Sequence, residues 1–428
     1  MTEPTAATRR LLLDLFEVAI ASAHPRVCLP PHLPAPPEGR LIVLASGKAA
    51  ASMAAVAAAH YRERGHGAVE GLAVTRHGYG EAVDGFEVIE AGHPVPDQAG
   101  IEATERTLAI AESAGEDDLV LVLLSGGGSA NWIAPSSGLS LENKQGLTKA
   151  LLRSGADIGE INTVRKHLSR IKGGRLAAAA APARILTLAI SDVPRDDPSV
   201  IASGPTVPDP STLADARAVL ERRGITPIPT VANLLADPAS ESPKPGDPAF
   251  AKAEFQIVAR PADTIAAVTE AARAAGYEPI SLGADLEGEA REVAAAHAEQ
   301  AKALKAAGRR AALVSGGELT VTIRGDGGRG GPNQEYALAL ALALAGESGI
   351  TALAGDTDGT DGGGGDASDP AGAIVDATTL ERATARGLDA AALLGANDST
   401  RFFETIGDLV SPGPTRTNVN DCRIILVD

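Results

Sequence analysis

The sequence predicts an α/β protein in which helices cover a largely parallel sheet. Short apolar runs typical of buried strands alternate along the chain with helical segments, which is the pattern of βαβ units. The 428 residues are enough for two or three domains with substantial cores. Hydrophobic residues make up 44% of the chain and charged residues 22%, which is a globular composition rather than a disordered one.

The first half of the chain carries one set of these elements. An amphipathic helix begins near Leu11, and a proline-rich loop is expected over residues 25–37. Strands are expected at 41–45, 72–75, 86–89, 119–124 and 185–190, and helices at about 49–60 and 100–113. The strand at 119–124 is the clearest, because every residue in it is Leu or Val.

A proline-rich stretch separates this set from a second one. Residues 237–248 hold four prolines and no apolar periodicity, so we expect domains at 1–238 and 251–428 with a linker at 239–250. Beyond the linker, strands are expected at 255–258, 278–281, 311–314, 350–354 and 424–427. Helices are expected at 263–275, 288–306 and 333–344, and residues 319–324 lead into a glycine-rich turn.

Charge and cysteine content exclude several classes of protein. With 38 basic against 55 acidic residues, the formal net charge is −17, which argues against a general nucleic-acid or anionic-membrane binder. Cys28 and Cys422 are the two cysteines, so a disulfide framework and a CxxC site are excluded, and both are interpreted as buried thiols.

No apolar run approaches the ~20 residues of a membrane span. Asp14 and Glu17 interrupt the N-terminal apolar run, so it is not a signal peptide. A cytoplasmic location is the simplest expectation, and a homo-oligomer is compatible with the sequence.

Many of the 47 glycines lie where predicted strands end. Ligands of open α/β sheets bind outside the carboxyl ends of the strands, so these positions are candidate sites. An apolar strand ends on Ser-Gly at Ser46, Ser125 and Ser315. The run Ser125-Gly-Gly-Gly-Ser129 allows backbone N–H groups to approach an anion. It is interpreted as a phosphate cradle, and the alternative is a tight turn that needs glycine for packing.

The pair Gly47-Lys48 is not part of a Walker A loop, because Ala49 stands where Ser or Thr is needed. Lys48 follows a strand directly, and an ammonium there can neutralise a phosphate as a point charge. The alternative is a solvated lysine on a loop.

A basic run and an acidic run follow further along. Residues 165–175 hold five Lys or Arg and no acid, so either Arg165 and Lys166 bind an anion or the run is a solvated helix face. Asp192 follows the strand at 185–190, where a carboxylate suits a general base or a Mg²⁺ ligand, although Asp is also common in turns.

Two glycine-rich loops occur in the second half. Residues 325–331 match GxGxxG, but a dinucleotide fingerprint also needs an acid at the end of the following strand, and none stands at the right distance. A loop over phosphates, with Arg324 and Arg329 nearby, fits better. Residues 355–366 do not match an EF-hand loop, because the sixth position counted from Asp356 holds Asp361 where glycine is needed. Their aspartates suit Mg²⁺ or an acidic turn.

In their order and number, these motifs resemble the class II D-glycerate kinases, the glycerate 2-kinases with a C-terminal MOFRL domain. The resemblance covers nearly the whole chain, from the ASGKAA segment at 45 to the NDCRI segment at 420. The motifs that carry it are Ser46-Gly-Lys48, Gly92-His-Pro-Val-Pro-Asp97, Leu124-Ser-Gly-Gly-Gly-Ser-Ala130, Asn162-Thr-Val-Arg-Lys166, Ser191-Asp-Val193, Ser203-Gly-Pro205, Ser315-Gly-Gly-Glu318, Asn333-Gln-Glu335, Gly355-Asp-Thr-Asp-Gly-Thr-Asp361 and Thr415-Arg-Thr-Asn418.

The resemblance implies a larger Rossmann-like three-layer αβα N-terminal domain and a smaller α/β C-terminal MOFRL domain, with the active site in the cleft between them. It also implies ATP-dependent, Mg²⁺-assisted phosphorylation of D-glycerate on its 2-hydroxyl. Some members carry arginine directly before Asn-Gln-Glu, where this chain has Pro332, so that role is lost or passes to Arg324 or Arg329.

Three groups of site residues follow from these motifs. The expected catalytic residues are Lys48, Asp192, Arg165, Lys166, Arg324 and Arg329. The residues expected to bind the nucleotide are Ser46, Gly47, Ser125, Gly126, Gly127, Gly128, Ser129, Ser315, Gly316, Gly317, Glu318, Asn333 and Gln334. The expected Mg²⁺ ligands are Asp192, Asp356 and Asp358. The other functions weighed are an NAD(P)H-dependent hydroxypyruvate reductase and a non-catalytic sugar-acid or nucleotide sensor.

Overall fold

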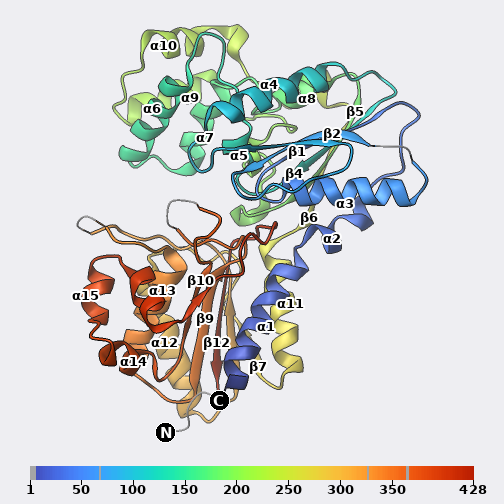
Figure 1. Cartoon of the computed structure of the whole chain (residues 1–428). Helices are drawn as coiled ribbons and strands as arrows, with labels where there is room; N and C mark the ends of the chain where they lie inside the picture. Colours follow the sequence, from blue (N-terminus) through green and yellow to red (C-terminus); the bar gives the residue numbers. More distant parts are fainter. Residues whose placement is uncertain (1–5, 67–68, 325–326, 363–365) are drawn as a thin grey trace. The chain divides into compact units, whose positions relative to one another are not determined.

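A computed structural model describes residues 6–66, 69–324, 327–362 and 366–428 (Figure 1). Its internal contacts divide the chain into two compact units. The central unit is Cys28–Val258, and the terminal unit joins Met1–Val27 to Ala259–Asp428. Each unit has its own sheet, and the cleft implied by the resemblance stays a prediction.

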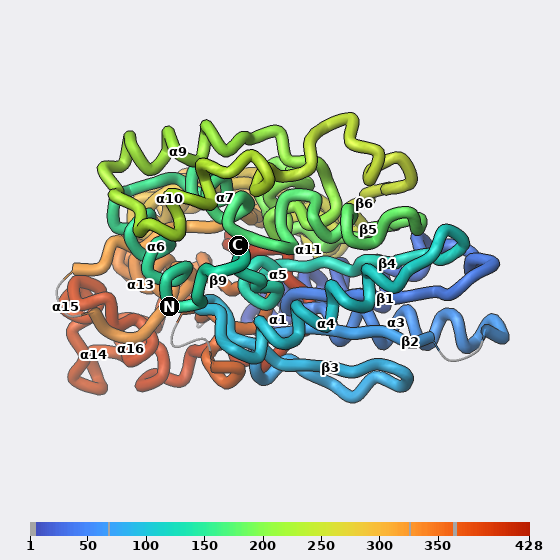
Figure 2. Tube along the Cα trace, turned by 90° about the horizontal axis from the view of Figure 1, so that it is seen from above, coloured from blue at the N-terminus to red at the C-terminus, as the bar shows by residue number. Residues whose placement is uncertain are grey.

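The central unit is built on a six-stranded sheet with the order β3-β2-β1-β4-β5-β6, which Figure 2 shows strand by strand. The pairs from β3 to β5 are all parallel. This order is that of the doubly wound nucleotide-binding folds, in which the strand order reverses beside β1 and leaves a crevice between β1 and β4. The strands are β1 (Leu41–Ser46), β2 (Glu70–Arg76), β3 (Phe86–Ala91), β4 (Leu119–Leu124), β5 (Arg184–Ile190) and β6 (Ala253–Ala259).

Apolar side chains hold this sheet between helices. Leu44, Val122 and Ile185 belong to one buried cluster with residues of α4 and α8, and every residue of β4 is buried. A second cluster joins α6, α7, α9 and α10 to one another. The helices are η1 (Pro30–His32), α3 (Ala50–Glu63), α4 (Gln98–Glu112), α5 (Gly128–Asn131), α6 (Leu141–Arg153), α7 (Ile158–His167), α8 (Arg175–Ala180), η2 (Pro194–Asp196), η3 (Ile201–Ser203), α9 (Leu213–Arg222), α10 (Pro229–Ala236), η4 (Pro238–Ser240) and η5 (Pro248–Phe250). The short helix α2 (Pro25–Cys28) contains the point where the chain passes from the terminal to the central unit.

The terminal unit has a mixed sheet with the order β11-β10-β9-β12-β8-β7. Strands β7 and β8 are parallel, and the other pairs are antiparallel. The strands are β7 (Glu278–Ser281), β8 (Ala311–Ser315), β9 (Ile350–Asp356), β10 (Gly372–Val375), β11 (Leu409–Val410) and β12 (Asp421–Val427).

Both faces of this second sheet are covered. Ile424 of β12 packs in a cluster with α1 and α11, while its neighbour Ile425 packs with α12 and α13 on the opposite face. Strand β12 is therefore buried on both sides, which explains its continuous apolar run. The helices are α1 (Ala6–Ser22), α11 (Pro261–Ala274), α12 (Ala290–Ala306), α13 (Pro332–Leu344), α14 (Thr379–Ala385), α15 (Ala390–Gly395) and α16 (Ser399–Ile406).

The division of the chain differs from the expected domain boundaries in two places. Helix α1 packs its apolar face, including Phe16, on α11, β9 and β12 of the terminal unit. The expected linker at 239–250 is packed within the central unit, because Glu241 bonds to buried His167 and Ser242 bonds to buried Asp209. Strand β6, expected in the second domain, forms the edge of the first sheet.

Two local expectations also need correction. The proline-rich loop at 25–37 contains two short helices, α2 and η1, because proline favours the first turn of a helix. The parallel sheet predicted for the chain is correct for the central unit, whereas the terminal sheet is mixed. Residues 319–324 contain one isolated bridge, from Thr320 to Glu289.

The two cysteines are buried and form no disulfide, as predicted. Burial raises the pKa of each thiol to about 12, so neither Cys28 nor Cys422 is poised as a nucleophile. In the described parts of the chain, no helix combines the length and the apolar character needed to cross a bilayer.

Candidate active site

The loops that follow β1 and β4 are joined at the switch point of the central sheet. The Ser125 N–H donates to the Ser46 carbonyl at 3.0 Å, and the Lys48 N–H donates to the Gly126 carbonyl at 2.8 Å. The Ala49 N–H donates to the Ser125 hydroxyl at 2.9 Å. These bonds fix the two loops to each other, so the residues of the expected sites at Ser46–Lys48 and Ser125–Ser129 lie side by side.

Glycine is required at two positions of these loops. Gly47 has a φ of +116°, and a Cβ there would lie 2.4 Å from the Ser125 carbonyl oxygen. Gly127 has a φ of +85°, and its Cβ would lie 3.0 Å from a His93 ring carbon and 3.4 Å from Lys48 Cγ. The side chains of His93 and Lys48 therefore flank the loop at Gly127.

The loop presents backbone donors. Among the described residues, no hydrogen-bond acceptor faces the N–H groups of Gly126, Gly127 or Ser129. Consecutive N–H groups in a turn that contains a left-handed residue form a concave site for anions. The loop thus has the donors of a phosphate cradle, which a turn needed only for packing would not require.

Two buried lysines and the half-buried Arg165 lie behind this loop. Arg165 donates from Nη2 to the Ser129 hydroxyl at 2.8 Å, and Lys172 donates from Nζ to the Ser129 carbonyl at 2.6 Å. Lys144 donates to the Leu168 carbonyl at 2.7 Å. In the described part of the chain, none of the three cations pairs with a carboxylate.

The surroundings of Arg165, Lys144 and Lys172 disfavour the charged forms of these side chains. Burial lowers the pKa of Arg165, and it lowers the pKa values of Lys144 and Lys172 well below the usual range, with repulsion from Arg165 next in importance. Buried charges are normally paired. A bound anion would supply the missing negative charge, so this cluster favours an anionic ligand.

Lys166 behaves differently from its neighbour Arg165. Its Nζ lies 3.4 Å from Asp209 Oδ1, and both side chains are buried. Burial alone would raise the pKa of Asp209, but Lys166 and the hydroxyls of Ser211 and Ser242 hold that pKa below its usual value. Lys166 thus forms an ion pair with Asp209, whereas Arg165 contacts the loop at Ser129.

Unusual backbone surrounds the position of Asp192. Asp192 follows β5 and is partly buried. Just beyond it, Arg195 and Asp196 have positive φ, as do Ala202 and Ser203, and the Ser203 hydroxyl lies 2.7 Å from that of Ser129. Such strain in non-glycine residues clusters at functional sites. The expected site at Asp192 therefore lies on a strained segment that also contacts the loop.

In the terminal unit, the loop after β8 is closed by a buried arginine. Arg423 donates to the carbonyl of Gly316 at 2.7 Å and to that of Gly317 at 3.2 Å, and it also forms an ion pair with Asp421. Ser315, Gly316 and Gly317 are buried, whereas Glu318 is exposed.

Asn333 and Gln334, at the start of α13, hold a buried carboxylate. The N–H of Asn333 donates to Asp361 Oδ1 at 2.9 Å, and the N–H of Gln334 donates to Asp361 Oδ2 at 2.8 Å. The Asn333 amide bridges to Asp421 at 2.7 Å. Burial raises the pKa of Asp361 to about 7, with Asp421 adding to this effect and the N–H donors opposing it.

Sequence reasoning did not select Asp361, Asp421 or Arg423 as site residues. Asp361 was weighed as a turn residue within 355–366, and Asp421 lies in a polar run next to Arg423. The available signal was that charged residues stand at the start of an apolar strand. Charged side chains are rarely buried in such a strand unless they are paired.

Asp356 is the last residue of β9, and Asp358 lies in the turn that follows. Asp356 Oδ1 accepts from the Asp358 N–H at 2.9 Å, and Asp358 Oδ1 accepts from the Thr360 N–H at 2.7 Å. The described residues contain no group of three His, Cys, Asp or Glu arranged for a metal. Mg²⁺ needs only one or two carboxylates when phosphates supply the rest, so this donor set fits it chemically. Gly363, Gly364 and Gly365 lie outside the described residues.

Arg324 and Arg329 are both exposed. Arg329 pairs with Glu404 at 2.6 Å, and Pro332 is the first residue of α13. A Cβ at Gly331 would lie 2.5 Å from Asp361 Oδ1, so this glycine permits close packing on Asp361. Residues 325 and 326 of the glycine-rich run lie outside the described residues.

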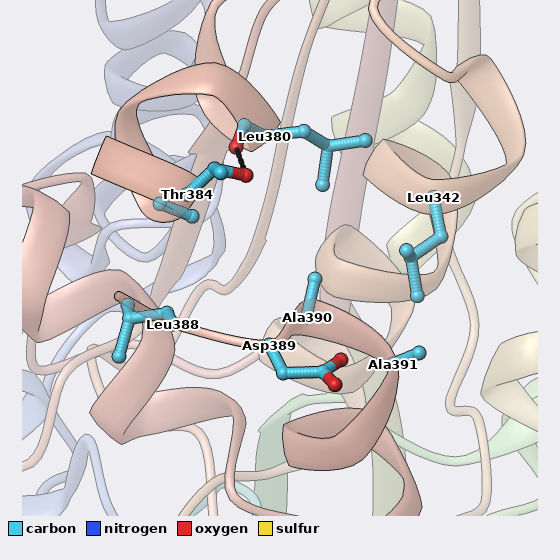
Figure 3. Close-up of a pocket in the computed structure, with 8 residues that line it drawn as sticks. Leu342, Leu380, Thr384, Leu388, Asp389, Ala390 and Ala391 are labelled. Carbon is cyan, nitrogen blue, oxygen red and sulfur yellow. Dashed lines mark hydrogen bonds between the residues drawn. The ribbon is translucent and has the colours of Figure 1, made fainter. Parts of the chain in front are cut away.

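A separate cavity of about 430 Å³ lies in the terminal unit beside α13, α14 and α15 (Figure 3). Thr384 donates to the Leu380 carbonyl at 2.9 Å, and Asp389 caps α15. The one charged side chain among the lining residues is a carboxylate, so this cavity offers no cation to a phosphate. The lining residues are Leu342, Leu380, Ala383, Thr384, Leu388, Asp389, Ala390 and Ala391.

The central unit combines a doubly wound sheet with a loop at the switch point that offers N–H groups and contacts cations. This combination is typical of α/β proteins that bind phosphate-like anions. The comparisons with known proteins identify the family of this chain. Residues 11–236 match a domain of unknown function, DUF4147, and residues 311–421 match the MOFRL family.

Similar proteins span the whole chain. A D-glycerate 2-kinase from Thermotoga maritima is 40% identical over 98% of this chain and 98% of its own length. A crystal structure of glycerate kinase from that organism has a TM-score of 0.86 at 39% identity, covering 99% of this chain and 100% of that one. A protein from Agrobacterium vitis, provisionally named hydroxypyruvate reductase, is 46% identical over 100% of this chain and 96% of its own. The chain belongs to the glycerate kinase family that joins a DUF4147 domain to a MOFRL domain, as the resemblance implied.

Proposed function

We propose that the chain is a glycerate 2-kinase that transfers the γ-phosphoryl group of ATP to the 2-hydroxyl of D-glycerate, which gives 2-phosphoglycerate and ADP. The observation that carries this function is the loop Ser125–Ser129, whose unengaged N–H groups lie beside cations without carboxylate partners. Phosphoryl transfer asks a protein mainly for positioning and electrostatic stabilisation, which such a loop supplies.

In the reaction, the 2-hydroxyl oxygen bonds to the γ-phosphorus as the bond to the ADP oxygen breaks. The hydroxyl proton passes to a base, for which we propose Asp192. Its strained neighbourhood and its place at the end of β5 support this role. We assign Lys48 to the transferring group, because its side chain flanks Gly127.

The other central residues position anions. We propose that the N–H groups of Gly126, Gly127 and Ser129 bind nucleotide phosphates and that Arg165 holds a phosphate or the substrate carboxylate. Lys166 acts by holding Asp209 and thereby fixes the end of α7.

For the terminal unit, we propose that Asp356 and Asp358 hold Mg²⁺, which neutralises charge on the donor phosphates when it is bound. The predicted nucleotide contacts of Ser315, Gly316, Gly317 and Glu318 stay predictions. Those of Asn333 and Gln334 stay predictions as well, and so do the catalytic roles of Arg324 and Arg329. A cytoplasmic location and a homo-oligomeric state also stay predictions.

The direct test supplies the purified chain with ATP, Mg²⁺ and D-glycerate and measures ADP release. Phosphorus NMR then distinguishes the 2-phosphate from the 3-phosphate. We expect ADP release that requires D-glycerate and a product with phosphate on carbon 2. Absence of glycerate-dependent ADP release, or a 3-phosphate product, would contradict the proposal.

The name of the Agrobacterium vitis relative raises hydroxypyruvate reduction as the second candidate. A dinucleotide site would be expected at the first βα turn of the doubly wound sheet, as G-x-G-x-x-G. That turn here reads Ser46-Gly47-Lys48-Ala49, with one glycine. NADH oxidation with hydroxypyruvate measures the second candidate directly, and we expect none above background.

A further inference from the structure

A cavity of about 320 Å³ lies in the central unit, between α6, α7 and the loop that follows β3. Its volume is within the range of small-molecule sites. The lining residues are Pro94, Val95, Pro96, Ile133, Leu141, Lys144, Gln145, Thr148, Lys149, Leu152, Ile158, Ile161 and Arg165.

The walls of this cavity are apolar and open to solvent. Val95 is 57% exposed, Leu152 is 60% exposed and Ile158 is 61% exposed, although each is a large apolar residue. Leu141, Gln145 and Leu152 recur at helical spacing, so one face of α6 forms a wall. Large apolar side chains that gather around one cavity mark a binding site rather than scattered surface residues.

The cavity lining includes cations, and one of them contacts the loop Ser125–Ser129. Arg165 lines the cavity and donates to the Ser129 hydroxyl at 2.8 Å. Lys144 lines it as well and is buried with no carboxylate partner among the described residues. A ligand with an apolar body and an anionic end therefore fits both the walls and the charge.

We propose that this cavity binds the purine nucleoside of the phosphoryl donor, with the phosphates directed past Arg165 to Ser125–Ser129. This assignment rests on the proposed function. D-glycerate carries an oxygen on each of its three carbons and has no apolar surface to match these walls. The nucleobase of the phosphoryl donor, in contrast, has flat apolar faces that can pack against them.

Gln145 supplies a polar contact for the base. Its Nε2 donates to the Pro96 carbonyl at 2.7 Å, which fixes the amide and leaves Oε1 as an acceptor. An acceptor on an apolar wall recognises the exocyclic amine of adenine and is left unpaired by hypoxanthine, which lacks that amine.

The test measures ADP binding to the full chain by titration calorimetry. In the double variant Leu152→Ser/Ile158→Ser, we expect the Kd for ADP to rise at least tenfold, because both side chains lose their contacts with the base. The Kd for inorganic tripolyphosphate should stay within twofold of the wild-type value, because this probe reaches only the loop. Ile228→Ser is the matched control, since Ile228 is 41% exposed and lies outside the cavity.

The outcomes separate this assignment from the proposed function. An unchanged Kd for ADP, or a raised KM for D-glycerate with normal nucleotide binding, overturns the nucleoside assignment. Because the titration needs no glycerate, a wild type that binds ADP but transfers no phosphate contradicts the function alone. We also expect the wild type to bind ADP more tightly than inosine diphosphate and Gln145→Ala to lose that preference. Equal wild-type affinities overturn the role of Gln145.

Discussion

The same strand-end signal, Ser-Gly, has different hydrogen-bond partners in the two units. In the central unit, the loop after β4 keeps N–H groups without acceptors beside Arg165 and Lys172, which lack carboxylate partners among the described residues. In the terminal unit, the carbonyls of the loop after β8 are taken by Arg423, and Asn333 holds Asp361. Ser-Gly at a strand end therefore indicates a turn, and the charged side chains around that turn differ between the two units.

The largest effect is expected in the central unit. Lys48→Ala should lower kcat about 10³-fold, equivalent to about 4 kcal/mol of transition-state stabilisation, because it removes a cation beside the loop Ser125–Ser129, for which we propose phosphate binding. ADP release under saturating substrates measures the loss. The fold should be unaffected, which a thermal melt checks.

Lys252→Ala is the control for this variant. Lys252 is an exposed lysine of the same unit that pairs with Glu116 at 3.0 Å, so its removal should leave kcat within twofold of the wild type. Turnover of Lys48→Ala close to that of Lys252→Ala would remove Lys48 from the site.

In the terminal unit, the expected loss is in stability. Arg423→Met should lower the free energy of unfolding by about 3–5 kcal/mol, because Asp421 stays buried without its cation and the carbonyls of Gly316 and Gly317 lose their donor. Urea denaturation measures the change. The exposed Arg401 of the same unit is the control, and Arg401→Met should change stability by less than about 0.5 kcal/mol.

The stability of the terminal unit should also depend on pH, because His297 of α12 is buried against Tyr336 of α13. Burial, with repulsion from Arg423 second, lowers the pKa of His297 to about 4, and its Nδ1 lies 2.8 Å from the Tyr336 hydroxyl. The unfolded chain binds a proton at this histidine near pH 6.5, whereas the folded chain does so only near pH 4. The free energy of unfolding should therefore fall as pH falls from 6.5 to 4, by up to about 3 kcal/mol.

His297→Gln removes this contribution, so its stability should depend less on pH over that interval than the wild type does. Denaturation at several pH values measures the slope. His66→Gln alters an exposed histidine and should keep the wild-type slope. Equal slopes for His297→Gln and the wild type would show that His297 gains its proton in the folded chain as readily as in the unfolded one.

Most of the fold follows from local patterns in the sequence. The strands at 119–124 and 278–281 were predicted with their observed bounds, and eight more were found within a few residues, because apolar runs between turn residues identify buried strands. Strands β10 and β11 were not predicted. The partners of each strand were beyond this reasoning. Nothing local to β6 assigns it to the first sheet, and nothing local to α1 assigns it to the terminal unit, because long-range packing decides both.

The candidate site was predictable where chemistry and chain position coincide. Lys48 and Ser125–Ser129 were selected because both follow buried strands, and the structure joins them. The cations Lys144 and Lys172 were not selected as site residues, since burial without a carboxylate is a three-dimensional property. Arg165 and Lys166 looked alike in sequence, and the position of Asp209 distinguishes them.

The smallest effect is expected from a pair of glycines in the central unit. Gly127 and Gly155 both have positive φ, at +85° and +72°, so alanine at either position should cost about 1 kcal/mol of stability. A Cβ at Gly155 meets open space, whereas one at Gly127 approaches His93 at 3.0 Å and Lys48 at 3.4 Å. Gly127→Ala should therefore also weaken ADP binding about tenfold, while Gly155→Ala should leave it unchanged. If the two variants bind ADP equally well, the loop at Gly127 does not hold the phosphates, and the contrast between the two units would lose its main support.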